Sequence, residues 1–233
     1  MARQKEFGEG PMYSFFNYVM WFFASNIYFM LCNILLVIYL MVFTSDINNT
    51  YVLLYIALLP VAPALTALYA TVGKIIREKD VSVTTYFFNS YKSNFKQAFI
   101  LGFIECTAIL VSIVDLKYFS TAKYGTYITP FFMIIIVFIF IIGLYVFPVL
   151  SRFYLKTSDI IKISFVYSIK KIHITIFNLS SITCAAFVFY KVPSISMFFI
   201  FSGTCYLIML QEMKILNELE SKTIKTQEQE NIL

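Results

Sequence analysis

Glu105 is the residue whose position most strongly indicates chemistry, because it is an acid within an apolar stretch. It lies nine residues beyond Lys96, which is about 13 Å along a helix that rises ~1.5 Å per residue. An ionised acid this deep in a bilayer is costly, and intramembrane acids often serve transport or proton transfer. The alternative is a structural acid packed against Asn33, Asn178 or Ser180 of neighbouring helices. We favour this alternative, since a lone acid is a poor proton relay, and we take Glu105, Asn33 and Asn178 as the candidate intramembrane polar site.

The other residues able to bind metals or act as nucleophiles are scattered. His173 is the single histidine and precedes an apolar stretch, where an interfacial residue is expected. The four cysteines occur singly in separate apolar stretches, at Cys32, Cys106, Cys184 and Cys205. A zinc site needs several ligands at short spacings, so we expect no metal and read the cysteines as small packing residues. The chain also lacks the G-x-S-x-G, H-E-x-x-H and P-loop motifs. We therefore expect no cofactor and no enzymatic activity.

Four long segments contain no Asp, Glu, Lys, Arg or His, namely residues 10–45, 47–73, 124–151 and 192–211. An apolar helix needs about 20 residues to cross a bilayer. Apolar residues make up 60% of the 233-residue chain and charged residues only 13%, roughly half the share in soluble proteins. These features predict an integral membrane protein, and the residues left between the segments are too few for a separate aqueous domain.

The sequence predicts an all-α, polytopic transmembrane helix bundle with about six spans. The predicted spans are residues 21–43, 51–73, 97–114, 127–149, 172–190 and 195–211. An uncharged lead-in, residues 11–20, is expected to lie in the membrane interface. The first apolar run is too long for a cleavable signal peptide, and no cleavage site is evident. We assign residues 1–213 to one membrane domain and residues 214–233 to a charged, disordered cytoplasmic tail, because apolar periodicity is lost after Leu219.

The basic residues fall into alternate gaps between the predicted spans. Fifteen of the 18 lie in the two termini and in the second-to-third and fourth-to-fifth connections, and only Lys117, Lys123 and Lys191 lie elsewhere. Cytoplasmic loops of membrane proteins are enriched in Lys and Arg. We therefore expect a multi-pass protein of the cell membrane with both termini in the cytoplasm. The net charge of +5 agrees with this topology and with affinity for anionic lipid. It does not indicate a nucleic-acid partner, since no soluble basic domain is present.

The two basic connections are longer than simple turns. The first, residues 83–95, carries aromatic residues at spacings of three and four, namely Phe87, Phe88, Tyr91 and Phe95. This spacing is typical of a helix in the headgroup region. The second, residues 158–171, mixes apolar and basic residues similarly. We predict two cytoplasmic amphipathic connecting helices, and we place Arg152 and His173 with these aromatic residues at the cytoplasmic interface.

The second predicted span carries a ridge of small residues, Ala62, Thr66 and Ala70, at four-residue spacing. Small side chains allow helix backbones to approach closely. Pro60 and Pro63 remove backbone donors and should kink the helix. A kinked helix with a small-residue face suits the centre of a bundle. It could also line a solute path, as broken helices do in transporters, but we favour packing.

Three segments together form a recognisable pattern. They are LPVAPALTALY at 59–69, TTYFFNSYKSNFKQA at 84–98 and YVFPVLSRF at 145–153, and Gly10-Pro11 precedes them. In this order they resemble the second-span motif, the Phe-rich loop and the fourth-span ending of the YesL-like family, a bacterial membrane group with a domain of unknown function. The resemblance covers about residues 7–215. The chain departs from the family in an extension at residues 33–58.

The resemblance implies a role without naming a reaction. Family members share their membrane threading and tend to be encoded beside bacterial sugar-uptake transporters and glycoside-degrading enzymes, and no catalytic residues are established for them. The implied role is an accessory or regulatory component of carbohydrate uptake or utilisation. The expected partners are the lipid bilayer and either a sugar transporter complex or a second copy of the chain. A small-solute transporter or permease is the alternative, and it would require polar residues that converge on Glu105.

Overall fold

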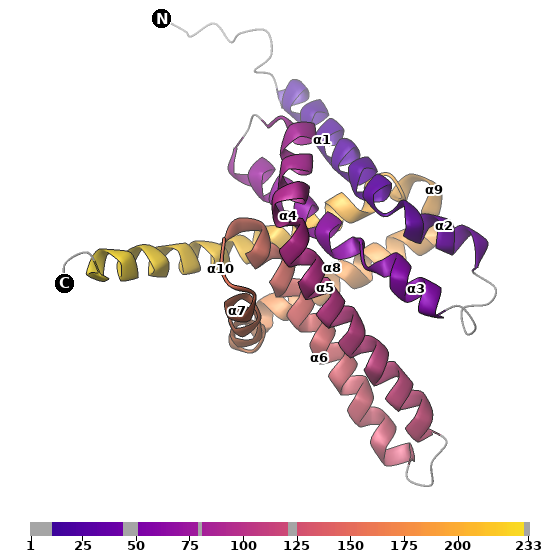
Figure 1. Ribbon diagram of the computed structural model, residues 1–233. Helices are drawn as coiled ribbons and strands as arrows, with labels where there is room; N and C mark the ends of the chain where they lie inside the picture. Colours follow the sequence, from indigo (N-terminus) through magenta and orange to yellow (C-terminus); the bar gives the residue numbers. More distant parts are fainter. Residues whose placement is uncertain (1–10, 44–50, 79–80, 121–124, 231–233) are drawn as a thin grey trace, which may run out of the picture.

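The computed structural model describes residues 11–43, 51–78, 81–120 and 125–230, and within these ranges it contains helices and no β-strand. The helices follow one another along the chain as shown in Figure 1. Their bounds are α1 Pro11–Cys32, α2 Ile34–Val42, α3 Tyr51–Leu58, α4 Val61–Arg77, α5 Val83–Ser120, α6 Gly125–Arg152, α7 Thr157–Lys170, α8 Ile172–Lys191, α9 Pro193–Ser196 and α10 Ile200–Glu230. The predicted all-α fold class is confirmed.

Among the described residues, five helical segments are long and apolar enough to cross a membrane. They are Phe15–Cys32, Val52–Arg77, Val83–Ser120, Tyr127–Arg152 and Ile172–Lys191. This confirms a multi-pass membrane protein. The sixth predicted span, residues 195–211, is not among the five. It falls on α9, a short break and the first part of α10, and Glu212 and Lys214 soon interrupt the apolar sequence of α10.

α10 nevertheless runs antiparallel to α8 where the two helices are in contact. Asn178 of α8 binds Glu212 of α10, and nearer the start of α8 Lys171 pairs with Glu218. From Phe201 to Glu218 the helix is about 26 Å long at ~1.5 Å per residue, close to the roughly 30 Å of a hydrocarbon core. A sixth crossing by α10 stays a prediction.

α4 lies at the centre of the bundle, in contact with α1, α5, α6 and α10 (Figure 1). Ala64, Leu68 and Val72 of α4 have no exposed surface and pack into the main apolar core with side chains of α6 and α10. The helix starts immediately after Pro60. Proline lacks a backbone N–H and its ring clashes with the preceding turn, which explains the break between α3 and α4.

α5 is one continuous helix of 38 residues, which corrects the prediction of a separate connecting helix at residues 83–95. That segment is the first part of α5. No proline or glycine occurs between residues 83 and 101, and Lys96, Gln97 and Ala98 are good helix formers, so nothing ends the helix before the span begins. The second connecting helix, predicted at residues 158–171, corresponds to α7, which is separated from α8 at Lys171.

α1 begins at Pro11, so the lead-in at residues 11–20 is part of the first helix. Its place in the membrane interface stays a prediction. α1 ends just before Asn33, whose side-chain amide donates a hydrogen bond to the Phe29 carbonyl oxygen at 2.8 Å. Short polar side chains that bond to the backbone compete with regular helical bonds. The predicted span 21–43 is therefore divided between α1 and α2.

α10 remains helical to Glu230, and the domain boundary predicted between residues 213 and 214 falls inside it. Ile215 and Leu216 are almost fully buried in the apolar clusters. They repeat the buried pair Ile208 and Met209 seven residues later, which is two helical turns along the same face. This packing extends the folded unit beyond the predicted boundary.

The outer part of the α5–α6 hairpin exposes many apolar side chains. The two helices pack along each other, and the ends joined by their connection extend away from the other helices (Figure 1). Val111, Val114, Ile134 and Val137 are each at least half exposed on this outer part. Within a bilayer such side chains contact lipid, which agrees with the apolar composition of the hairpin.

Candidate functional site

Glu105 lies on α5 opposite Gly143 of α6. A Cβ atom added to Gly143 would overlap the Glu105 carboxylate, so the acid occupies space that only a glycine leaves open. One turn earlier on α5, Gly102 approaches α4 so closely that an added Cβ would overlap Cβ of Ala62. Two glycines therefore bring three helices together around one acid.

A cavity of about 240 Å³ adjoins Glu105 between α4, α5 and α6. Tyr69 and Cys106 contribute to its lining, which is otherwise almost entirely apolar. A second cavity of about 180 Å³ includes Glu105 and Gly143 and is lined by further α5 and α6 residues and by Ile161. Glu105 is the one charged residue in the described linings of both cavities. The acid thus borders two apolar spaces.

The structure does not bring the candidate polar site together. Asn33 bonds to the backbone of its own helix, and Asn178 donates to Glu212 at 2.9 Å. Ser180 likewise bonds to the Phe177 carbonyl oxygen within α8. Among the described residues, no group forms a hydrogen bond with the Glu105 carboxylate, and this includes the three side chains just named.

Glu212 is a second acid within the bundle, and the sequence analysis missed it. Its side chain is 1% exposed, and the Asn178 amide nitrogen donates to its Oε1. Glu212 directly follows the sixth predicted span, which ends at residue 211. The signal that could have identified it is its position between the apolar pairs Ile208–Met209 and Ile215–Leu216, which places it on the buried face of α10.

Tyr69 connects the surroundings of the two acids. It is 2% exposed, it lines the larger Glu105 cavity, and it packs in the same apolar core as Cys205 of α10. Both Tyr69 and Cys205 lie within electrostatic range of Glu212. We call Glu105, Tyr69, Cys205, Glu212 and Asn178 the polar layer.

The polar layer lies within the bundle, away from its charged ends. Tyr69 precedes Arg77, at the end of α4, by eight residues, and Gly143 precedes Arg152, at the end of α6, by nine residues. At ~1.5 Å per residue, the layer lies about 12–14 Å from these charged ends.

Asn26 has a structural role at the break between α9 and α10. Its amide nitrogen donates to the Met197 carbonyl oxygen at 2.8 Å, and its oxygen accepts from the backbone N–H groups of Phe201 and Ser202 at 3.1 and 3.3 Å. The first N–H groups of a helix have no partner within it. Asn26 of α1 therefore caps α10 from a neighbouring helix.

The three residues of the small-residue ridge are all buried on α4. Ala62 contacts Gly102 of α5, and the Thr66 hydroxyl donates to the Ala62 carbonyl oxygen at 2.9 Å. Ala70 is 3% exposed. Beyond them, Gly73 faces the Met209 side chain of α10, which an added Cβ would displace. Small residues on α4 therefore lie at its contacts with both α5 and α10.

The residues assigned to the interface occupy different environments. Phe87 is fully buried and packs against Tyr28, whereas Phe88 and Phe95 are 44% and 41% exposed. Tyr91 is half-buried and makes an edge contact with Phe95. Phe87 therefore packs inside the bundle at the start of α5, and the cytoplasmic interfacial place of this set stays a prediction.

The two polar residues of this set also differ. Arg152 ends α6, and its guanidinium binds the Asn217 side-chain oxygen at 2.9 Å and the Glu220 carboxylate. His173 is exposed in the first turn of α8. No group of three or more His, Cys, Asp or Glu side chains in the described ranges could hold a metal ion. The chemistry within the bundle therefore centres on single acids, which can exchange a proton or bind a cation.

Residues 22–116 match a family described as "Protein of unknown function, DUF624". Two proteins of Bacillus subtilis (strain 168) are also similar to the chain. Uncharacterized protein YesL is 29% identical over 49% of this chain and 54% of its own length. The resemblance to the YesL-like family is confirmed. Uncharacterized protein YteU is 28% identical over 73% of this chain and 78% of its own length.

The family match covers the part of the chain from the middle of α1 to the outer end of α5. It therefore includes Glu105 and Tyr69, whereas Gly143 and Glu212 lie outside it. The match to YesL itself spans about half of the length of that protein. No solved structure is similar to the chain at a significant level.

Proposed function

We propose that this YesL-like protein is a non-catalytic membrane subunit that acts as an accessory or regulatory component of bacterial carbohydrate uptake or utilisation. The carbohydrate context rests on the family resemblance. The subunit role rests on the lining of the larger Glu105 cavity, in which Glu105, Tyr69 and Cys106 are set among apolar side chains. A solute path is lined by hydrogen-bond donors and acceptors that match its solute. A sugar would find few partners in this cavity.

The partner we propose is a sugar transporter complex in the same membrane. The outer part of the α5–α6 hairpin supports this proposal, because it offers two apolar helix surfaces that no other described element covers. A photo-reactive residue at Val137 should crosslink to the permease of a sugar transporter encoded nearby, while the same residue at Val188 of α8, which is also exposed, should not. A crosslink between two copies of the chain would instead identify self-association.

Co-purification provides the direct test of the subunit role. After mild solubilisation, the tagged chain should carry transporter subunits with it at a fixed stoichiometry. Purified protein alone that takes up a sugar after reconstitution would contradict the proposal. Carbohydrate-dependent growth of a deletion strain links the complex to its role, and growth that is independent of the protein on every carbohydrate tested would contradict that role.

A small-solute transporter is the alternative, and the polar layer favours it. Glu105 borders open space that Tyr69 also lines, and Tyr69 packs in the same core as Cys205 of α10. A coupling acid must ionise during a transport cycle, so Glu105→Gln would abolish uptake at normal protein abundance. For the subunit we expect Glu105→Gln to support normal growth, with abundance measured on membranes.

We also propose a cell-membrane location with both termini in the cytoplasm, on the basis of the alternating basic residues. Single cysteines introduced into a cysteine-free chain test this orientation. Replacements of Ser45 and Thr121 should react with an impermeant reagent from outside. Replacements of Ser82 and Ser158 should react only after permeabilisation, and external labelling of either would contradict the proposed orientation.

A further inference from the structure

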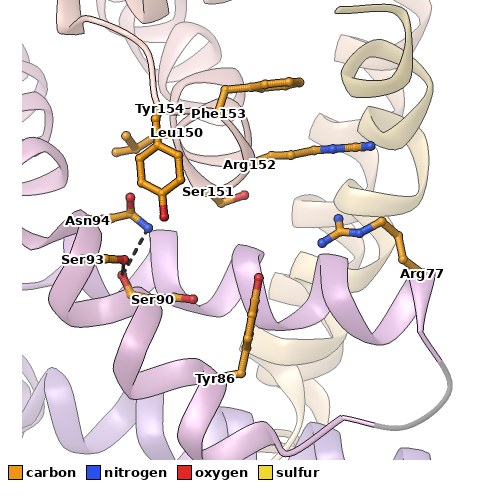
Figure 2. A pocket seen from close by; sticks show the side chains of 10 residues that line it. All are labelled: Arg77, Tyr86, Ser90, Ser93, Asn94, Leu150, Ser151, Arg152, Phe153 and Tyr154. Carbon is orange, nitrogen blue, oxygen red and sulfur yellow. Dashed lines mark hydrogen bonds between the residues drawn. The ribbon is translucent and has the colours of Figure 1, made fainter. Parts of the chain in front are cut away.

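A polar pocket of about 140 Å³ lies where α4 and α6 end, beside the first part of α5 (Figure 2). Two of the segments able to cross the membrane end at Arg77 and Arg152, and both residues line the pocket. Because apolar spans end where the hydrocarbon ends, the pocket lies at the depth of the lipid headgroups. Its described lining contains two arginines and no acid.

Arg77 is the cation of this pocket for which the described residues provide no acid partner. Arg152 is already held by Asn217 and the Glu220 carboxylate. Nearby, Lys74 pairs with Glu78 at 3.5 Å and lies over the Tyr86 ring. No described acid pairs with Arg77, and Figure 2 shows its side chain extending from the end of α4 toward Tyr86 and Ser151.

Hydroxyl and amide groups surround the space that Arg77 enters. Ser93 and Asn94 each donate to the Ser90 carbonyl oxygen at 3.2 Å, as the dashed lines in Figure 2 show. The hydroxyls of Ser90 and Tyr86 have no hydrogen-bond partner among the described residues, although Ser90 is only 8% exposed. Both hydroxyls line the cavity that the Arg77 side chain also lines, so both are available to donate to a ligand there.

We propose that this pocket binds a phosphate group, with the Arg77 guanidinium as its charge partner and the Tyr86 and Ser90 hydroxyls as further donors. A phosphate oxygen pair matches the fork of N–H groups on a guanidinium, and the remaining oxygens accept from hydroxyls. The phosphate can belong to an anionic lipid headgroup or to a dissolved phosphate ester, because the pocket lies at the membrane surface. The proposal is independent of the carbohydrate role.

Two binding measurements distinguish these sources. Purified protein in detergent without phospholipid is titrated with inorganic phosphate and followed by ³¹P NMR line broadening. The same preparation is titrated with phosphatidylglycerol, with diacylglycerol as the phosphate-free comparison, and bound lipid is counted by native mass spectrometry. Broadening by phosphate alone assigns a dissolved ligand, selective retention of phosphatidylglycerol alone assigns a headgroup, and both together assign a general phosphate site. Absence of both overturns the proposal.

Arg77→Gln should weaken the observed binding about tenfold or more, as expected for loss of a hydrogen bond to a charged group. Lys170→Gln on α7 is the matched control, since Lys170 is exposed and its loss changes net charge equally. Equal weakening by both variants would show diffuse attraction to positive charge and would overturn the proposed site.

Tyr86→Phe is the second variant, because it removes one hydroxyl and keeps the aromatic ring beneath Lys74. We expect it to weaken binding about tenfold, the lower end of the range for one hydrogen bond to a charged group. Thermal unfolding without ligand checks that each variant folds like the parent. Parent-like binding by both Arg77→Gln and Tyr86→Phe would show that these residues do not form the site.

Discussion

Glu105 and Glu212 are two acids within the same helix bundle, and their surroundings differ in almost every respect. Glu212 is 1% exposed and accepts a hydrogen bond from Asn178. Glu105 borders two cavities and has no hydrogen-bond partner among the described residues. One acid is fully enclosed by its neighbours, whereas the other has space into which its side chain can move.

The difference arises from the helices that face each acid. α8 presents an amide to Glu212, and that amide compensates for part of the cost of burial. α6 presents a glycine to Glu105, which provides space without a donor. An acid that keeps one fixed partner is suited to holding helices together. An acid beside empty space is suited to binding a cation or exchanging a proton, so Glu105 is the better functional candidate of the two.

Packing on the α4 side of Glu105 should be the least tolerant of change. Ala62→Leu would introduce a larger side chain where Ala62 already meets Gly102, and we expect it to lower stability by up to about 3 kcal/mol, since overpacking a core typically costs 1–3 kcal/mol. Thermal unfolding in detergent measures the change. Ala108→Leu is the matched control, because Ala108 lines the smaller Glu105 cavity, and it should cost much less. Equal losses would show that the space beside Glu105 is not available to a larger side chain.

Removal of the partner of Glu212 should have the next largest effect. Asn178→Leu leaves the buried acid without its donor, and we expect a loss of about 1–3 kcal/mol, the usual cost of an unsatisfied buried polar group. Adding Glu212→Leu to the same chain should recover most of this loss, because both polar groups are then removed. A double variant that is no more stable than Asn178→Leu would mean that the pair does not act as a unit.

Replacement of Glu105 itself should have the smallest effect on stability. Glu105→Leu removes an acid that has no described hydrogen-bond partner, so we expect a change below about 0.5 kcal/mol, the range of substitutions that break no specific contact. Glu212→Leu in an otherwise unchanged chain is the comparison, and it should be more destabilising because it leaves the Asn178 amide unpaired. The same thermal assay measures both variants. A larger loss for Glu105→Leu would remove the distinction between the two acids.

Most of the bundle could be predicted from local sequence features. Apolar segments of membrane length identified the five helical segments that are long and apolar enough to cross a membrane, since burial in hydrocarbon requires continuous apolar helices. The errors occurred where two elements join. Residues 83–95 were separated from the following span because their charge pattern differs, but charge does not end a helix when no cap, proline or glycine intervenes.

The candidate site was predicted less completely, and for a different reason. Glu105 was identified because an acid among apolar residues is visible in the sequence. The partners proposed for it, Asn33 and Asn178, bond elsewhere in the structure. The sequence does not specify how the helices that carry or adjoin these residues are rotated, or which helices they neighbour. The ridge on α4 is visible as a spacing, but the residue it meets, Gly102, depends on how α4 and α5 cross.

The sequence by itself determined that this chain enters a membrane, that its helices cross it several times and that Glu105 lies within an apolar helix. These properties depend on the polarity of neighbouring residues along one chain, and a single helix already expresses them. Only the tertiary structure decided that Glu105 faces Gly143 and a cavity, that Glu212 pairs with Asn178, and that Arg77 enters a polar pocket with Tyr86. Such pairings depend on helix crossings, which are set by packing among residues distant in sequence.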